Sequence, residues 1–340
     1  MSSLKKIADR ISSVTATRQL TASMKMVAVS QLKKKHATFL RSVPYADESN
    51  RVVRRLVRAV LEQGNPYALP PLLQDNPMAQ KYWVLTITSD NGLSGASQIQ
   101  VAQQTKKIVD YLIEQGKEVR LMSYGLRGLP LLKRFYPDMD ISAFRQKKTT
   151  AETVPALAEQ FSSEIMRAFE HGAFDVCLIV YNQFNSLVSQ HPTIDQFIPA
   201  KMFLKENPWA FLIGDTAQIK QKVKPSSFLK AIGGAEVLPS LRNIIFKTDL
   251  ASGKRSPYLY DYEPSTVSLL QDMLPSYLSA YIYRVLLESE ISDNAARLMA
   301  MDNATRNAGE MLDNLNKVYR RNRQTKITTD IAEVSGIGKD

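Results

Sequence analysis

The pattern closest to a binding motif is the turn Gly92-Leu93-Ser94-Gly95, which follows an apolar run. Glycines directly after a strand are typical of dinucleotide-binding sites, because they let the backbone approach a phosphate. Such sites use three glycines at the G-x-G-x-x-G spacing, whereas this turn has two at a different spacing. We therefore interpret the turn as an ordinary link between a strand and a helix. Asp90, just before it, is expected to act as the N-cap of that helix.

The other reactive residue types are too sparse to predict a catalytic or metal-binding site. His36, His171 and His191 are scattered along the chain and lack the spacing of metal ligands. Cys177 is the only cysteine and lies in an apolar run, where a buried, unreactive thiol is expected. The glycines of the tail 336–339 lack the preceding strand and following helix of a phosphate-binding loop. The residues therefore predict a non-enzymatic chain with no catalytic residues, no cofactor and no metal.

Both ends of the chain are predicted to be long helices. The first covers residues 1–62, in which the only proline is Pro44 and glycine is absent. The second covers residues 265–335, with Ser265 as a plausible N-cap and Pro275 marking either a kink or a second start. Helices of globular proteins average about a dozen residues, so these two are expected to project from a domain.

Each terminal helix carries a stripe of apolar or small residues at three-four spacing, which is typical of helices that pack along another helix. A helix rich in polar residues gains most of its stability from such packing. We therefore expect the two helices to pair as a long antiparallel coiled coil. The stripes comprise Leu4, Ile7, Ile11, Val14, Thr21, Ala28 and Leu32 in the first helix, and Ile291, Ala295, Leu298, Thr305, Ala308, Leu312, Leu315 and Tyr319, interrupted by Asp302, in the second.

The middle of the chain, residues 78–262, alternates strand and helix patterns, which predicts a largely parallel sheet in a Rossmann-like α/β foot domain. Prolines and glycines break the pattern over 201–257. The fold class is thus α/β, with a two-helix coiled coil added. The expected strands are 82–88, 118–124 and 174–181, and 185–190 and 237–246 are further candidate strands. The expected helices run from the glycine turn to about Gln115 and over 151–170.

The net charge of +11 is concentrated in the first helix, where thirteen basic and three acidic residues occur up to Val60. A basic helix requires an acidic partner, such as nucleic acid, anionic lipid or an acidic protein collar. One hypothesis is a basic coiled-coil nucleic-acid-binding protein in which Arg51, Arg54, Arg55 and Arg58 follow the phosphates. Against it, the basic residues lack interleaved aromatics.

The chain also lacks the apolar stretch of a signal peptide or a membrane span, and its cysteine content predicts a reducing compartment.

Two segments carry a more specific signal. They are TASMKMVAVSQLKK at 21–34 and AARLMAMDNATRNA at 295–308. Together they resemble the gamma subunit of F-type ATP synthases, the rotating central shaft. The turn after the first strand is similar as well, but Asn91 and Ser94 stand where that family usually has arginine and cysteine. The stretch 201–257 also exceeds the usual length.

The resemblance implies a non-catalytic central stalk that couples ion flow through the membrane rotor ring to ATP synthesis or hydrolysis at the beta subunits. The partners it implies are the alpha and beta subunits, the epsilon subunit and the ring of c subunits, without nucleic acid. The implied location is peripheral, on the cytoplasmic face of the cell membrane. The coupling ion, proton or sodium, stays open. The positions implied to contact the beta subunits are Arg18, Met24, Lys25, Lys33, Lys34, Arg306, Gln324, Thr328 and Asp330.

Overall fold

A computed structural model describes residues 2–62, 68–74, 76–144, 154–200, 209 and 262–337. The expected strand 237–246 and the stretch 201–257, Trp209 excepted, lie outside the described residues. The chain divides into two compact units. The helix-pair unit comprises Met1–Gln31 and Arg297–Asp340, and the sheet unit comprises Leu32–Ala296.

Two long helices occupy the ends of the chain, as the sequence predicts. Helix α1 spans Ser2–Glu62 and helix α9 spans Thr266–Ile337. The N–H of Ser268 donates to the Ser265 hydroxyl at 3.1 Å, so Ser265 is the N-cap of α9. Pro275 lies inside α9, which continues through it without a second start, and Pro44 likewise lies inside α1.

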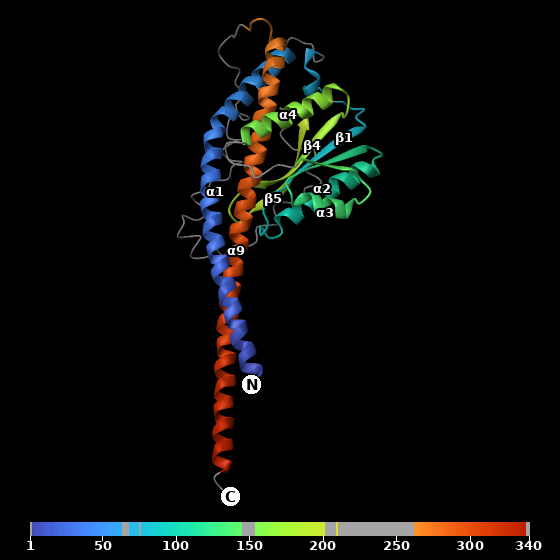
Figure 1. The fold of residues 1–340 in the computed structure, drawn as a ribbon. Helices are drawn as coiled ribbons and strands as arrows, with labels where there is room; N and C mark the ends of the chain where they lie inside the picture. Colours follow the sequence, from blue (N-terminus) through green and yellow to red (C-terminus); the bar gives the residue numbers. More distant parts are fainter. Residues whose placement is uncertain are drawn as a thin grey trace. The chain divides into compact units, whose positions relative to one another are not determined.

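The sheet unit contains a five-stranded sheet in the order β3-β2-β1-β4-β5 (Figure 1). Strands β1, β2, β3 and β4 are parallel to one another, and β5 pairs antiparallel with β4. Strand β4 lies inside the sheet, between β1 and β5, which agrees with its nearly continuous apolar sequence, since strands buried on both faces do not alternate. The strands are β1 (Lys81–Ile87), β2 (Glu118–Tyr124), β3 (Ile141–Phe144), β4 (Val176–Phe184) and β5 (Gln190–Ile198).

Three elements differ from the sequence prediction. The residues 185–189 form a turn rather than a strand, in which the N–H of Ser186 donates to the carbonyl of Ser189 at 2.9 Å, and β5 follows it. Asn and Ser readily form such local turns, and this competes with strand pairing. Helix α3 (Gly128–Phe135) and strand β3 were not predicted, because both are short and gain their stability from packing on the sheet.

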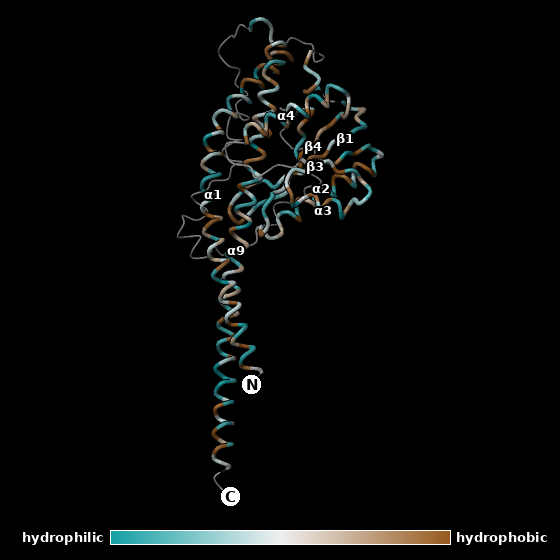
Figure 2. The backbone as a smooth tube through the Cα atoms, viewed as in Figure 1, coloured by the Kyte–Doolittle hydropathy of each residue, from teal (hydrophilic) through white to brown (hydrophobic). Residues whose placement is uncertain are grey.

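Helices cover the sheet. Side chains of α2 (Ser97–Glu114) and α3, among them Ile108, Leu112 and Leu132, form one core with Val84 and Leu178 of the strands. Helix α4 (Val154–Glu170) lies over the other face in Figure 1. Apolar segments accordingly gather in the strands and helices of this unit in Figure 2.

Parts of α1 and α9 belong to the sheet unit and pack on each other there. Val53, Leu56 and Val60 of α1 form a buried cluster with Leu270 and Leu274 of α9. Farther along, the Lys35 ammonium and the Glu290 carboxylate form an ion pair at 2.5 Å. A short 3-10 helix, Pro71–Leu73, packs against the same cluster through Leu72 and Leu73.

Candidate partner-binding surface of the helix pair

The helix-pair unit packs through a narrow seam that combines small and larger apolar side chains. Thr21 and Ala28 of α1 are buried, as are Leu298, Ala308 and Leu312 of α9. These residues belong to the stripes expected from the sequence, which confirms their assignment to the packed face. Small residues let two helix backbones approach closely, so the remaining circumference of each helix stays exposed. That exposed circumference is the surface a partner can reach.

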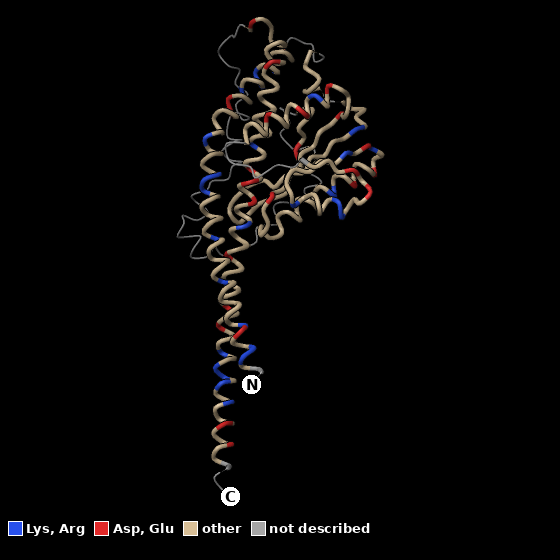
Figure 3. The backbone as a smooth tube through the Cα atoms, in the orientation of Figure 1, with Lys and Arg blue, Asp and Glu red and all other residues tan. Residues whose placement is uncertain are grey.

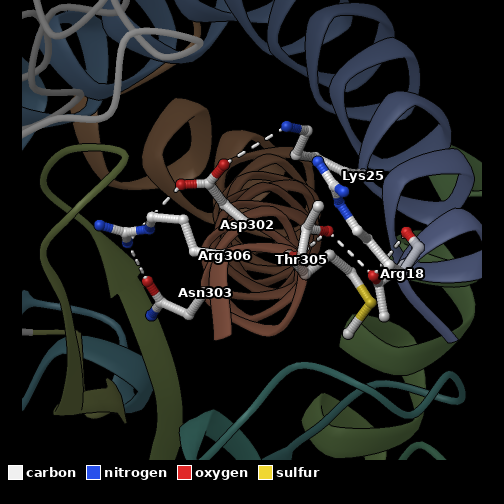
Figure 4. Close-up of polar contacts among 8 residues, drawn as sticks. Arg18, Lys25, Asp302, Asn303, Thr305 and Arg306 are labelled. Atoms are coloured by element: carbon white, nitrogen blue, oxygen red, sulfur yellow. Dashed lines mark hydrogen bonds and ion pairs between the residues drawn. The ribbon is translucent and has the colours of Figure 1, made fainter. Parts of the chain in front are cut away.

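Asp302 lies buried in this seam and organises the charges around it (Figure 4). Its side chain is 5% exposed, and its Oδ1 lies 3.4 Å from the Nζ of Lys25, whose side chain is 13% exposed. Its other oxygen, Oδ2, lies 3.8 Å from a guanidinium nitrogen of Arg306. That second separation is a charge contact and is too long for a hydrogen bond. A buried carboxylate needs such partners, since an isolated buried charge is costly.

A hydroxyl pair reinforces the same seam. The Oγ1 atoms of Thr21 and Thr305 lie 2.9 Å apart and share a hydrogen bond between the two helices (Figure 4). One turn away, Gly309 lies beside Arg18, and a Cβ at that glycine would make an ordinary contact with the arginine Nε at 3.9 Å. The two polar contacts fix the register of the pair, since sliding either helix would leave polar groups buried without partners.

The residues implied to contact the beta subunits differ in their surroundings. Lys25 and Arg306 converge on Asp302, so part of their charge is used within the unit. Arg18 is exposed and Met24 is half-buried on α1. The remaining residues are exposed and lie far apart along the helices: Lys33 and Lys34 in the sheet unit, and Gln324, Thr328 and Asp330 near the end of α9.

The end of α9 exposes apolar side chains beside basic ones. Ile331 is 63% exposed and Val334 is 74% exposed, and Ile327 is exposed as well. Within the helix-pair unit, α9 continues past the N-terminal end of α1, and basic residues follow its surface there (Figure 3). Exposed apolar residues framed by charges indicate a contact surface. The basic side chains, all exposed, are Lys317, Arg320, Arg321, Arg323 and Lys326.

In the sequence, Asp302 is recognisable only as an interruption of the apolar stripe, and its role in the seam was not predicted. The available signal was an acid standing inside an apolar stripe, with basic residues at helical spacing from it. A second acid, Asp293, was also overlooked: its Oδ1 accepts from the Gln98 side chain at 2.6 Å and thereby links α9 to the start of α2 within the sheet unit.

The turn after β1 has a structural role that corrects one prediction. Asp90 does not cap α2, which begins after Ala96 without a side-chain cap. Its Oδ1 instead accepts the backbone N–H of Leu126 at 2.9 Å and ties the turn to the end of β2. Nearby, Gly125 has a φ of +90°, and a Cβ there would lie 2.2 Å from the Thr88 carbonyl oxygen. The loop is therefore closed by backbone packing.

The remaining reactive groups of the sheet unit are buried. Cys177 has no exposed surface, and burial raises the pKa of its thiol, so the expectation of a buried cysteine is confirmed. Within the described ranges, histidine, cysteine and acidic side chains nowhere gather as a metal site would require. Those same ranges contain no helix long and apolar enough to cross a membrane.

A buried polar network joins the sheet to α9 inside the sheet unit. The hydroxyls of Tyr181 and Tyr281 both donate to Oδ2 of Asp195, at 3.0 and 2.9 Å. Burial raises the pKa of Glu288 to about 7, against the attraction of Arg284. The Arg284 guanidinium lies 4.8 Å above the centre of the Tyr281 ring. The hydrogen bonds to Asp195 attach α9 to the sheet, and the Glu288 carboxyl titrates near neutral pH.

Comparison with known proteins gives consistent matches along the whole chain. A family model described as ATP synthase matches residues 3–337. The ATP synthase gamma chains of Bartonella henselae and Rhodospirillum rubrum are 31% and 32% identical, over 98% of this chain and 98% of each relative. Among solved structures, a chain of the Euglena gracilis mitochondrial ATP synthase, OSCP/F1/c-ring, matches with a TM-score of 0.55 and 15% identity. It covers 98% of this chain and 93% of that one, and it supports the mixed α/β fold with long terminal helices.

Proposed function

The chain belongs to the family of ATP synthase gamma chains, and from this premise we propose that it acts as the non-catalytic central shaft of such a complex. The observation that carries the proposal is the match to relatives over 98% of the chain at about 31% identity. Nothing in the comparisons supports the alternative of a nucleic-acid-binding coiled coil. Under this proposal, the basic side chains of the first helix bind acidic surfaces of partner proteins.

The proposed partners follow from the same premise. The alpha and beta subunits would surround the helix pair, and the sheet unit would meet the epsilon subunit and the membrane ring of c subunits. Solved structures similar in fold include the Tetrahymena thermophila mitochondrial ATP synthase central stalk and c-ring, with a TM-score of 0.50 and 20% identity. The proposed location is peripheral, on the cytoplasmic face of the cell membrane. The proposed functional division is a shaft from 1–62 and 265–335 and a foot from 78–262.

The proposed mechanism rests on unequal contacts around the shaft. A rotating element changes the affinities of surrounding sites only if it interacts differently with their conformations. The helix pair supplies such asymmetry, because α9 is exposed alone near its C-terminal end and carries basic and apolar side chains there. Exposed ion pairs contribute about 1 kcal/mol or less, so they can form and break as the shaft turns. We propose that Arg18, Met24, Lys33, Lys34, Gln324, Thr328 and Asp330 contribute contacts of this kind, together with the outward parts of Lys25 and Arg306.

Co-purification from the native cells tests the assignment. A tagged full-length chain is expected to bring down alpha and beta subunits together with ATPase activity. A lone chain that binds DNA tightly, with affinity falling steeply as salt rises, would contradict the assignment and support the nucleic-acid alternative.

A truncation tests the role of the exposed end of α9. Ending the chain after Asn314 removes the exposed basic and apolar residues while retaining the Asp302 and Thr305 contacts. Coupling and assembly are expected to be impaired, with the sheet unit still folded by circular dichroism. Unchanged ATP synthesis with the truncated chain would count against the shaft mechanism.

A further inference from the structure

The sheet unit contains a cavity that the proposed shaft function does not use. It has a volume of about 420 Å³ and is lined by residues of α1, α4 and α9. This size falls in the range of roughly 300–1,000 Å³ that small-molecule sites occupy. Ala46 of α1, Met166 of α4 and Ala280 of α9 contribute apolar surface, and Arg284 of α9 contributes a charge.

Arg284 is a charged side chain with unused hydrogen-bond donors. Its Nε is buried and has no hydrogen-bond partner. Among the described residues, no carboxylate lies within ion-pair distance of its guanidinium, which stacks over the face of the Tyr281 ring and is attracted by the more distant Asp195 and Glu288. A buried polar group without a partner costs about 1–3 kcal/mol, and more when it is charged. The side chain is therefore suited to receive an acceptor from outside the chain.

The acidic groups near Arg284 are engaged in other contacts. Oδ2 of Asp195 accepts from the hydroxyls of Tyr181 and Tyr281. Glu288 accepts from the backbone N–H of Phe184 and from the Gln183 side chain, while the Glu288 Oε1 has no hydrogen-bond partner. The remaining acid on the cavity wall, Glu159, is exposed on α4 and so is solvated. Arg284 thus lines the cavity with a buried Nε–H that has no hydrogen-bond partner, although Asp195 and Glu288 attract its charge.

We propose that this cavity is a binding site for a small amphiphilic carboxylate. The carboxylate accepts two hydrogen bonds from the Arg284 guanidinium, a geometry for which arginine is well suited. The apolar part of the ligand lies against Ala46, Met166 and Ala280, where it leaves water. Because the cavity is bounded by both terminal helices and by α4, a bound ligand stabilises the packing of these three helices.

Titration of the full-length chain with decanoate, followed by calorimetry, tests the proposal. Decanoate is expected to bind saturably, and decanol, which has the same chain without the charge, is expected to bind at least about tenfold more weakly. Equal affinities for decanoate and decanol would overturn the role of Arg284, and the absence of saturable decanoate binding would overturn the site.

Two variants locate the site. Ala280→Phe places a ring in the cavity while keeping Arg284, and Arg284→Gln removes the charge; each is expected to weaken decanoate binding at least about tenfold. Ala37→Phe is the matched control, because Ala37 is exposed on α1 and lies outside the cavity lining. The decanoate affinity of this control should equal that of the unchanged chain. Because Arg284→Gln disturbs a buried network, Ala280→Phe decides the question if the arginine variant unfolds. Decanoate affinity unchanged by Ala280→Phe would contradict the proposal.

Discussion

The helix-pair unit and the sheet unit achieve order by different means. The sheet unit buries large apolar side chains on both faces of its sheet, with Leu85, Ile108 and Leu178 essentially inaccessible to solvent. The helix-pair unit buries only a narrow stripe of apolar and small residues and depends on Asp302 and a pair of threonines for register. The difference shows that a thin helical pair can hold a defined alignment with little apolar burial, provided that a few polar contacts are specific.

The first prediction has the largest expected effect and compares a leucine substitution in the core of each unit. Leu178→Ala should lower the local free energy of opening by about 3–5 kcal/mol, because β4 is central and the resulting cavity cannot collapse. Leu312→Ala in the helix pair should cost about 2 kcal/mol, because a seam between two helices relaxes more easily. Hydrogen exchange resolved by peptide measures both in one molecule. Equal losses of local free energy of opening would show that the two units respond alike to the removal of a buried leucine.

The second prediction concerns the buried charge of the helix pair. Lys25→Met leaves Asp302 with only the longer contact to Arg306 and should destabilise the pair by about 1–3 kcal/mol. Adding Asp302→Leu should recover most of that loss, because the unpaired carboxylate is then removed. A double-mutant cycle on local hydrogen exchange measures the coupling. Additive losses would show that the two charges do not depend on each other.

The third prediction uses the raised pKa of Glu288 in the sheet unit. Burial raises the pKa of this carboxyl from 4.5 to about 7, so the folded protein keeps a proton that the unfolded chain releases. Stability should therefore fall as pH rises from about 5 to about 7.5 and then level off, by up to about 3 kcal/mol.

Comparison with Glu288→Gln isolates that contribution. The amide does not titrate, so the variant should lack this part of the pH dependence. Burial lowers the pKa of His36 and His191, which gives the opposite trend, but both histidines remain in the variant and cancel in the difference. Identical urea-denaturation midpoints against pH for the two proteins would show that Glu288 does not titrate in this range.

The smallest expected effect on stability lies at the exposed end of α9. Arg320→Gln and Arg323→Gln together should change the melting temperature by about a degree or less, because both side chains are solvated. Under the proposed function they should nevertheless weaken binding to an alpha and beta assembly and reduce its salt dependence. A large loss of stability would place these arginines in a packed contact instead.

The terminal helices and the main strands could be predicted because their apolar residues follow a regular pattern. The three-four stripes revealed both terminal helices, and the apolar runs revealed β1, β2 and β4. The short elements α3 and β3 could not be found, since nothing local distinguishes them before they pack on the sheet. The turn before β5 was not predicted, although its Asn and Ser residues are types that readily form local turns.

Site prediction had a different limit. The resemblance named residues along both helices, but the sequence could not tell which charges are used internally. Asp302 and Arg306 are four residues apart on one helix, and a pair at that spacing is readable. The partnership of Lys25 with Asp302 joins opposite ends of the chain, and only the register of the helix pair reveals it. The Arg284 cavity is likewise assembled from three separate helices.

The pairing of the two ends of the chain is the claim on which the shaft depends, and a crosslink tests it most directly. The hydroxyl oxygens of Thr21 and Thr305 lie 2.9 Å apart, so Thr21→Cys with Thr305→Cys places two thiols within reach of a disulfide. The native Cys177 is buried and should not interfere. Oxidation of the assembled complex is expected to close the bond within one chain and to leave ATP synthesis intact, because the pair turns as one body. Failure of the bond to form, or loss of synthesis once it forms, would contradict the account.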